Sequence, residues 1–192
     1  MSKINIIAIC GKSASGKDTI LKKVSEAADC KTIVSCTTRP KREEEIDDVD
    51  YHFLTLDEFT KRTMSGDMLE ATIFNNWCYG TSLKELDPDK VNVGVFNPEG
   101  IEILLEDPRV HLTIYYISTS DKIRLMRALM REKSPNVKEI IRRYTTDEKD
   151  FSNFETFLFR YGIVLKNETR ENLIENVRII VDKINSLNCS EI

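Results

Sequence analysis

The chain has 192 residues, of which 41% are hydrophobic and 31% are charged. This length suits one domain with a sizeable core, and the composition argues against a largely disordered chain. The formal net charge of -4 leaves no general excess of positive charge for a nucleic-acid backbone, so we expect no polymeric nucleic-acid partner.

The five cysteines are scattered along the chain, and no two of them form a C-x-x-C pair. Their odd number and spacing do not suggest a disulfide framework or a zinc site, which favours a reducing compartment. The amino-terminal apolar run is too short for a signal peptide, and no stretch approaches transmembrane length. We therefore expect a cytoplasmic protein without a membrane partner, acting as a monomer or homodimer.

The first predicted element is a buried parallel strand at residues 4–10, whose β-branched residues run directly into Gly11. After Lys17, apolar residues recur at helical spacing, at Ile20, Leu21, Val24, Ala27 and Ala28. A strand, a glycine-containing loop and a helix in this order form the context of a phosphate-binding loop.

Later segments alternate between the two kinds of element. Short apolar runs predict strands at residues 32–35, 91–96, 111–117 and 161–165. Longer periodic stretches predict helices at residues 98–106, 121–133, 137–153 and 169–184. This alternation predicts an α/β fold, in which helices cover both faces of a parallel sheet.

The pattern changes between Thr37 and Leu83, where short alternating segments follow a charged loop and a helix is expected at residues 57–64. We interpret this region as an inserted subdomain. Its acidic run, Glu43 to Glu45, is predicted to be a solvated loop.

Residues 11–17, which read GKSASGK, satisfy the pattern G-x-x-x-x-G-K. The glycines let backbone N–H groups turn inward around phosphate oxygens, and the following helix points its amino terminus at the same anion. Lys17 is expected to reach the transferring phosphate. ATP or GTP is thus the predicted ligand of Gly11, Ser13, Ala14, Ser15, Gly16, Lys17, Asp18 and Thr19. The alternative is a glycine turn without a ligand.

Position 18 departs from the usual motif, because Asp18 stands where Ser or Thr normally contacts magnesium. Thr19 follows one residue later. A carboxylate can ligate Mg²⁺, although its charge is unfavourable beside a triphosphate unless the metal or a lysine neutralises it. Asp18 is therefore the predicted Mg²⁺ ligand, and the alternative is a position just outside the ligands of the ion.

Residues 34–42, which read VSCTTRPKR, resemble the guanylate kinase family. The resemblance continues through residues 50–53 (DYHF), 69–70 (LE) and 79–81 (YGT), in the family's order and close to its spacing. It implies an ATP- and Mg²⁺-dependent nucleoside monophosphate kinase with a P-loop-type parallel sheet. One domain would then comprise a core at 1–36, 84–120 and 155–192, an acceptor-binding insertion at 37–83 and a helical lid at 121–145.

By the same resemblance, the acceptor phosphate would be held by Arg39, Arg42, Tyr51 and Tyr79. Guanidinium groups pair with a dianionic phosphate, while phenols donate neutral hydrogen bonds that orient it. The base would be contacted by Ser35, Glu70 and Thr81. Glu70 can accept from guanine N1–H and N2–H₂, whereas adenine would leave these groups unsatisfied, so GMP or dGMP is the expected acceptor.

Positive charge is dense between residues 121 and 143, with arginines at 124, 127, 131, 142 and 143. In the resembling family this region is the lid, which implies that Arg127, Arg131 and Arg142 neutralise the phosphates during transfer. The alternative is an ordinary basic surface paired with Glu132 and Glu139. Residues 163–168 resemble the family's final strand and an Asn-containing turn near adenine.

The resemblance breaks after the strand at 91–96, where Val95 and Asn97 occupy places that are usually acidic. Asn97 can still hydrogen-bond and is a predicted substrate contact. We favour moved metal ligation, in which Asp18 replaces a lost carboxylate, over altered acceptor preference. A kinase for a different base and a non-catalytic module that binds a phosphorylated protein stay open as alternatives.

Overall fold

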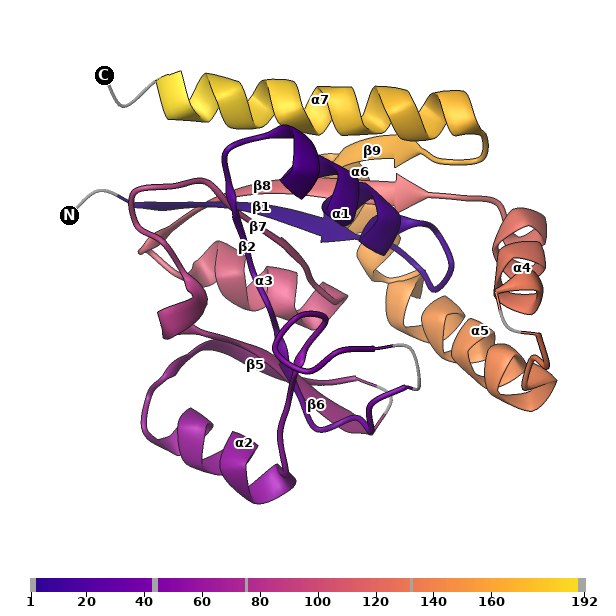
Figure 1. Ribbon diagram of the computed structural model, residues 1–192, viewed down its shortest axis with the longest axis horizontal. Coiled ribbons are helices and arrows are strands. Elements are labelled where there is room, and N and C mark those ends of the chain that lie inside the picture. The colour runs from indigo at the N-terminus through magenta and orange to yellow at the C-terminus, as the bar shows by residue number, and fades with distance from the viewer. Residues whose placement is uncertain (1–2, 43–44, 75, 132, 190–192) are drawn as a thin grey trace.

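The computed structural model describes residues 3–42, 45–74, 76–131 and 133–189, which include a five-stranded and a four-stranded sheet (Figure 1). The larger sheet has the order β2-β7-β1-β8-β9, and all its neighbouring strands pair in parallel. Its strands are β1 (Ile4–Cys10), β2 (Lys31–Thr32), β7 (Asn92–Val95), β8 (Val110–Ser118) and β9 (Ile163–Lys166).

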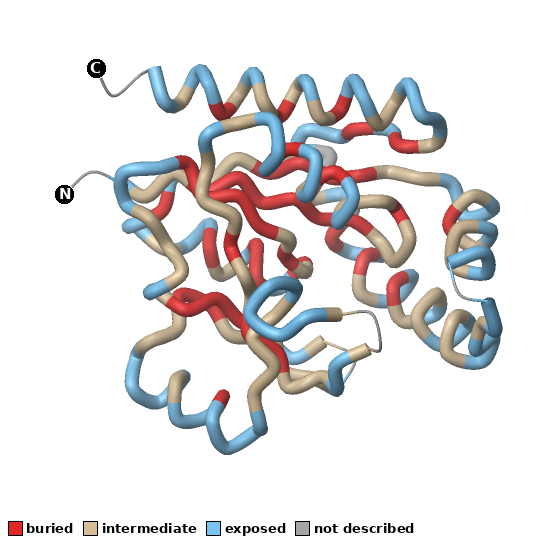
Figure 2. The backbone as a smooth tube through the Cα atoms, viewed as in Figure 1, coloured by how far each residue is buried: buried red, intermediate tan, exposed pale blue. Residues whose placement is uncertain are grey.

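Helices cover both faces of this sheet. Alternate side chains of β1 point to opposite faces, so β1 contributes to the hydrophobic core on each side. One face packs against α3 (Pro98–Glu106), α5 (Val137–Ser152) and α6 (Phe154–Tyr161). The other face packs against α1 (Lys17–Ala27) and α7 (Arg170–Cys189). Figure 2 shows the resulting buried layer along the central strands. Burial on two faces explains why β1 is apolar throughout rather than alternating.

The smaller sheet lies apart from the larger one and has the order β4-β3-β6-β5 (Figure 1). It is mixed, since β3 runs parallel to β4 but antiparallel to β6. Its strands are β3 (Cys36–Thr37), β4 (His52–Phe53), β5 (Met68–Phe74) and β6 (Trp77–Ser82). The helix α2 (Leu56–Met64) connects β4 to β5, and the short helix η1 (Leu83–Glu85) follows β6. A parallel sheet between helices with a separate small mixed sheet confirms the predicted α/β class.

Several bounds differ from the sequence-based prediction, since the helix expected at residues 121–133 ends at Met130 and the one expected at residues 169–184 runs from Arg170 to Cys189. The strand expected at residues 32–35 is wrong except at Thr32, because β2 of the large sheet ends there, residues 33–35 belong to no strand and β3 of the small sheet begins at Cys36. The helix expected at residues 137–153 ends at Ser152 and is followed by a separate helix, α6, which includes Tyr161, the first residue of the last expected strand. Local apolar patterns do not indicate which sheet a short segment joins.

Helix α4 (Asp121–Met130) lies with α5 at one end of the large sheet (Figure 1). Helix α4 begins directly after the carboxyl-terminal end of β8, where the loop after β1 also lies, and α5 runs back toward the sheet. In the part of the chain that the structure describes, no helix has the length and apolar character needed to cross a membrane.

Candidate active site

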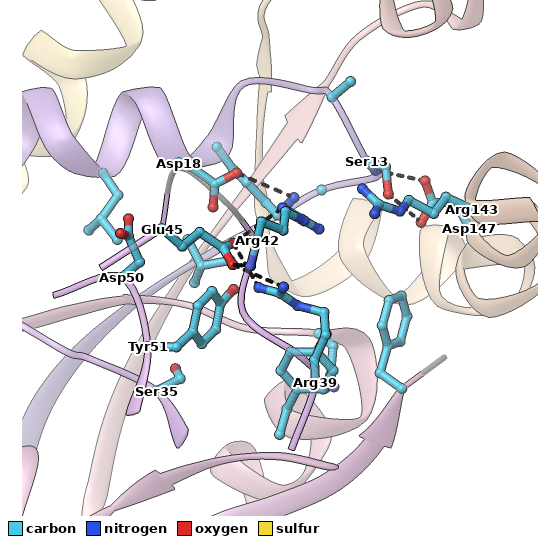
Figure 3. A pocket seen from close by; sticks show the side chains of 18 of the residues that line it. Ser13, Asp18, Ser35, Arg39, Arg42, Glu45, Asp50, Tyr51, Arg143 and Asp147 are labelled. Carbon is cyan, nitrogen blue, oxygen red and sulfur yellow. Dashed lines mark hydrogen bonds and ion pairs between the residues drawn. The ribbon is translucent and has the colours of Figure 1, made fainter. Parts of the chain in front are cut away.

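A cavity of about 1580 Å³ lies between the loop after β1, the small sheet and the helices α4 and α5. It is lined by residues from all three predicted regions (Figure 3). Ligands of open parallel sheets bind at the carboxyl ends of the strands, where this cavity begins. The lining includes Gly11, Ser13, Ala14, Lys17, Asp18, Ser35, Arg39, Arg42, Tyr51, Glu70, Tyr79, Asn97, Arg131 and Arg142.

The loop between β1 and α1 has a backbone that suits an anion. Gly16 has a φ of 96° and occupies the N-cap of α1 without any side-chain cap. The N–H groups in the first turn of a helix have no intrahelical acceptor, so those of Lys17 and Asp18 are available to a ligand. Thr19 follows in the same turn and is exposed.

The Ser15 carbonyl of this loop is held by side chains from three other segments. It accepts hydrogen bonds from Asn167 Nδ2 at 2.7 Å, Thr119 Oγ1 at 3.1 Å and Arg127 Nη1 at 3.1 Å. A Cβ atom at Gly16 would collide with the Asn167 amide, which explains the glycine there. Ser15 Oγ and Asn167 Oδ1 are buried without a hydrogen-bond partner among the described residues, which fits a polar ligand beside the loop.

Lys17 and Asp18 both line the cavity, and Lys17 Nζ lies 3.9 Å from the Asp18 carboxylate. Within the described ranges, no three His, Cys, Asp or Glu side chains gather in a cluster that could hold a metal ion. Magnesium in phosphoryl-transfer enzymes is usually held by one or two carboxylates together with substrate phosphates and water. A single exposed carboxylate beside the loop fits that kind of site.

Arg39 and Arg42, the arginines predicted to bind the acceptor phosphate, share one carboxylate, Glu45 (Figure 3). Arg39 Nη2 and Nη1 donate to Glu45 at 2.7 and 3.0 Å, and the Arg42 backbone N–H donates to it at 2.8 Å. Although burial opposes ionisation of Glu45, hydrogen bonds from Arg39 and Arg42 lower its pKa. The prediction of a solvated loop is therefore wrong for Glu45, while Glu43 and Glu44 lie outside the described residues.

The arginines near Arg42 carry more positive charge than the single carboxylate of Glu45 neutralises. The pKa of Arg42 is lowered first by burial and then by the positive charges of neighbouring arginines, namely Arg39, Arg143 and Arg131. Arginine stays protonated at neutral pH despite such a shift, so the consequence is a positive potential that favours an anion. The Arg39 guanidinium also lies 5.3 Å from the ring centroid of Tyr51, which itself makes an edge contact with Tyr79 at 6.2 Å.

A buried carboxylate, that of Glu70, lines the part of the cavity formed by the small sheet. Glu70 on β5 is 6% exposed and accepts a hydrogen bond from Thr81 Oγ1 at 2.9 Å. Burial raises the Glu70 pKa to about 7, against the hydrogen bond from Thr81, which lowers it. Asn97 lies beside this pair, where its Nδ2 donates to Thr72 at 2.7 Å and its Oδ1 caps α3 through Gly100 N–H at 2.8 Å.

The sequence matches the guanylate kinase family model over residues 3–184. The chain belongs to the guanylate kinase family. This confirms the resemblance inferred from the acceptor segment, and the match includes both sides of the cavity.

Similar proteins extend over nearly the whole chain. A guanylate kinase of Thermotoga maritima is 29% identical over 184 residues, covering 93% of this chain and 86% of the relative. A guanylate kinase of Campylobacter jejuni is 28% identical over 183 residues, covering 92% of this chain and 87% of the relative. The crystal structure of guanylate kinase from Anaplasma phagocytophilum is 22% identical and has a TM-score of 0.68, covering 97% and 88% of the two chains. At that identity the structure supports the fold alone.

The arginines that the family resemblance assigns to the lid have different environments. Arg131, Arg142 and Arg143 line the cavity. Arg142 and Arg143 also pair with Glu139 at 2.7 and 2.8 Å, and hydrogen bonding from Arg142 contributes most to lowering the Glu139 pKa to about 2. Arg127 instead lies against the Ser15 carbonyl, and Glu132, the other expected partner, is outside the described residues.

Two site residues were missed by sequence reasoning. Glu45 had a local signal, because a carboxylate three residues after Arg42 can reach back to that residue's backbone N–H. Asp147 had none, since its partner Ser13 is 134 positions away along the chain. Both carboxylates line the cavity of this guanylate kinase family member.

Proposed function

We propose that the protein transfers the γ-phosphoryl group of ATP to GMP or dGMP, giving ADP and the corresponding nucleoside diphosphate. The observation that carries the proposal is a single cavity lined by both Lys17 of the phosphate loop and the Arg39–Arg42 pair. Phosphoryl transfer requires donor and acceptor phosphates in line and close together, and such a cavity can hold both.

On the donor side, the amino terminus of α1 and Lys17 would bind the triphosphate. ATP with Mg²⁺ supplies the phosphoryl group and neutralises phosphate charge when bound, and Asp18 would be the protein ligand of that ion. Asn167, whose buried Oδ1 has no hydrogen-bond partner among the residues that the structure describes, would face the adenine amino group.

On the acceptor side, Arg39 and Arg42 would bind the monophosphate, whose oxygen is the nucleophile, and no covalent intermediate with the protein is needed. Tyr51 and Tyr79 would donate hydrogen bonds that orient it. The positive potential around Arg42 supports this role, because it would draw in a dianion. Most of the catalysis would then come from positioning and charge stabilisation.

The base would bind at Glu70 and Thr81, with Ser35 at the cavity wall. An ionised Glu70 accepts from guanine N1–H and N2–H₂. Asn97 would support this pocket by holding β5 next to α3. From the lid, Arg131 and Arg142 would neutralise the charge of the transferring phosphoryl group. Arg127 would contribute its positive charge from its place against the Ser15 carbonyl of the phosphate loop.

An ADP-release assay across the common ribo- and deoxyribonucleoside monophosphates, with Mg²⁺-ATP as donor, tests the proposal. We expect the highest kcat/KM with GMP or dGMP. Preference for another base would contradict the assignment of Glu70. Calorimetric binding of GMP without turnover of any acceptor would instead show a non-catalytic binding module.

A further inference from the structure

A buried ion pair joins the two lid helices at their inner ends. Arg124 on α4 lies 2.8 Å from Asp147 on α5, and each side chain is only 2% exposed. Removing two charges from water is unfavourable, so such a pair persists only when its remaining donors and acceptors are satisfied. The hydrogen-bond partners of Arg124 and Asp147 therefore indicate the role of the pair.

Ser13 of the phosphate loop supplies these groups. Its backbone N–H donates to Asp147 Oδ2 at 2.7 Å, and its hydroxyl donates to Oδ1 at 3.2 Å. Its carbonyl accepts from Arg124 Nε at 3.1 Å. Every polar group of Ser13 is therefore bonded to the ion pair, and Figure 3 shows Ser13 and Asp147 facing each other.

A second layer of charges surrounds this contact. Lys12 Nζ lies 3.0 Å from Glu148, which is also 3.3 Å from Arg124 Nη1. Asp121 lies 2.9 Å from the same guanidinium nitrogen, and the Tyr144 ring lies 5.0 Å below the guanidinium. The loop is thus tied to both lid helices by paired charges whose centre is closed to water.

We infer that Asp147 is a positioning residue that sets the shape of the phosphate loop for the donor nucleotide. While Ser13 N–H is bonded to Asp147, the phosphates must bind to N–H groups further along the loop and at the start of α1. A loop already held in one conformation loses less entropy when the ligand binds. The expected effect on the KM for ATP rests on the proposed function, whereas the expected effect on the conformation of the loop does not.

The same bridge divides α5 into two parts. At Asp147 the helix is anchored to the loop, whereas the Arg142 side chain, more than one turn earlier, is 45% exposed. Closure of the lid over the substrates would therefore move the arginine-bearing end of α5, with its Asp147 end as the fixed base.

The test is Asp147→Asn, which keeps an oxygen acceptor for Ser13 N–H but removes the charge that Arg124 binds. Asp107→Asn is the matched control, because Asp107 also accepts from a backbone N–H, that of Arg109, at 2.9 Å and pairs with the Arg109 guanidinium at 2.6 Å. For Asp147→Asn we expect the KM for ATP to rise by about tenfold and the KM for GMP to change by less than about twofold. The control should leave both unchanged.

Hydrogen exchange of residues 11–17 gives a readout that is independent of turnover. We expect faster exchange in Asp147→Asn and no change in Asp107→Asn. An unchanged KM for ATP together with unchanged exchange in folded Asp147→Asn would overturn the inference. If this variant fails to fold, Arg124→Lys decides by the same two measurements, since it keeps the positive charge but loses the Nε donor to Ser13; wild-type values there would overturn the inference too.

Failure of the proposed function is distinguishable from failure of the bridge. Wild-type protein without kinase activity would overturn the proposed function. Exchange of residues 11–17 would then decide the bridge by itself, with faster exchange in Asp147→Asn supporting it and unchanged exchange refuting it.

Discussion

The donor and acceptor sides of the cavity are built in opposite ways. The phosphate loop is held by buried side chains from distant parts of the chain, as in the bonds of Asp147 to Ser13 and of Asn167 to Ser15, which span 134 and 152 positions. The acceptor arginines are held by Glu45, which is six residues after Arg39 and three after Arg42. The donor side therefore depends on contacts between distant segments, whereas the acceptor arginines are held by a residue nearby in the sequence.

This difference has a physical consequence for binding. The buried ion pair of Arg124 and Asp147 resists rearrangement, because breaking it leaves charges unpaired in a dry environment. The contacts of Glu45 with Arg39 and Arg42 lie within one short segment, so they can move with that segment without breaking bonds to distant elements. We therefore expect the donor side to be preorganised and the acceptor side to adjust when its ligand arrives.

The largest effect is expected for Lys17→Ala, which removes the charge that we propose lies nearest the transferring phosphate. We expect kcat to fall by about 1000-fold, while GMP affinity measured by calorimetry changes by less than about threefold. Lys23→Ala, on the exposed face of the same helix, is the control and should behave as wild type. An equal loss of GMP affinity in Lys17→Ala would show that the two sides are not separable.

Glu70→Gln should have the next largest effect, on base preference. The amide cannot accept from both guanine N–H groups without presenting its own donor, so we expect the kcat/KM ratio of GMP to AMP to fall by about 100-fold. Glu106→Gln, at the exposed end of α3, is a suitable control. Unchanged preference would contradict the role assigned to Glu70.

The raised pKa of Glu70 predicts how GMP binding depends on pH. With a pKa of about 7, the carboxylate is mostly ionised at pH 8 and mostly protonated at pH 6. We expect the KM for GMP to rise by about tenfold between pH 8 and pH 6. Glu70→Gln should remove most of this dependence, and an equally steep profile in the variant would point to another group.

The same pKa also predicts a stability change with a definite sign. The Glu70 pKa rises from an ordinary value of 4.5 to about 7 on folding, so between these pH values the folded state binds more protons than the unfolded state. Its contribution to stability therefore decreases as pH rises through this window. Denaturant unfolding should show Glu70→Gln stabilised relative to wild type more at pH 8 than at pH 5.

The smallest effect is expected for Glu45→Gln, which tests whether the acceptor side adjusts. Both guanidinium groups and the Arg42 N–H are oriented by Glu45, so we expect the KM for GMP to rise by about fivefold and the KM for ATP to stay unchanged. A lower KM for GMP would show instead that Glu45 competes with the acceptor phosphate.

Local features of the chain were predictable from the sequence. The strand β1, which ends just before Gly11, and the helix α3 were predicted with the bounds that they have in the fold. The order of the phosphate-loop and acceptor motifs was enough to identify the family, because each motif is a short segment whose residue types carry the chemistry. The α/β class followed from the alternation of apolar runs and helical periods.

What only the tertiary structure decided was which distant groups meet. Nothing near Asp147 in the sequence indicates that it would bond to Ser13. Nor does the local pattern show that Thr32 lies in the large sheet and Cys36 in the small one. Side-chain partners at such separations are set by how helices and sheets pack, and local patterns do not encode that packing. The sequence by itself therefore determined the family and the motifs, whereas packing decided how the phosphate loop is held.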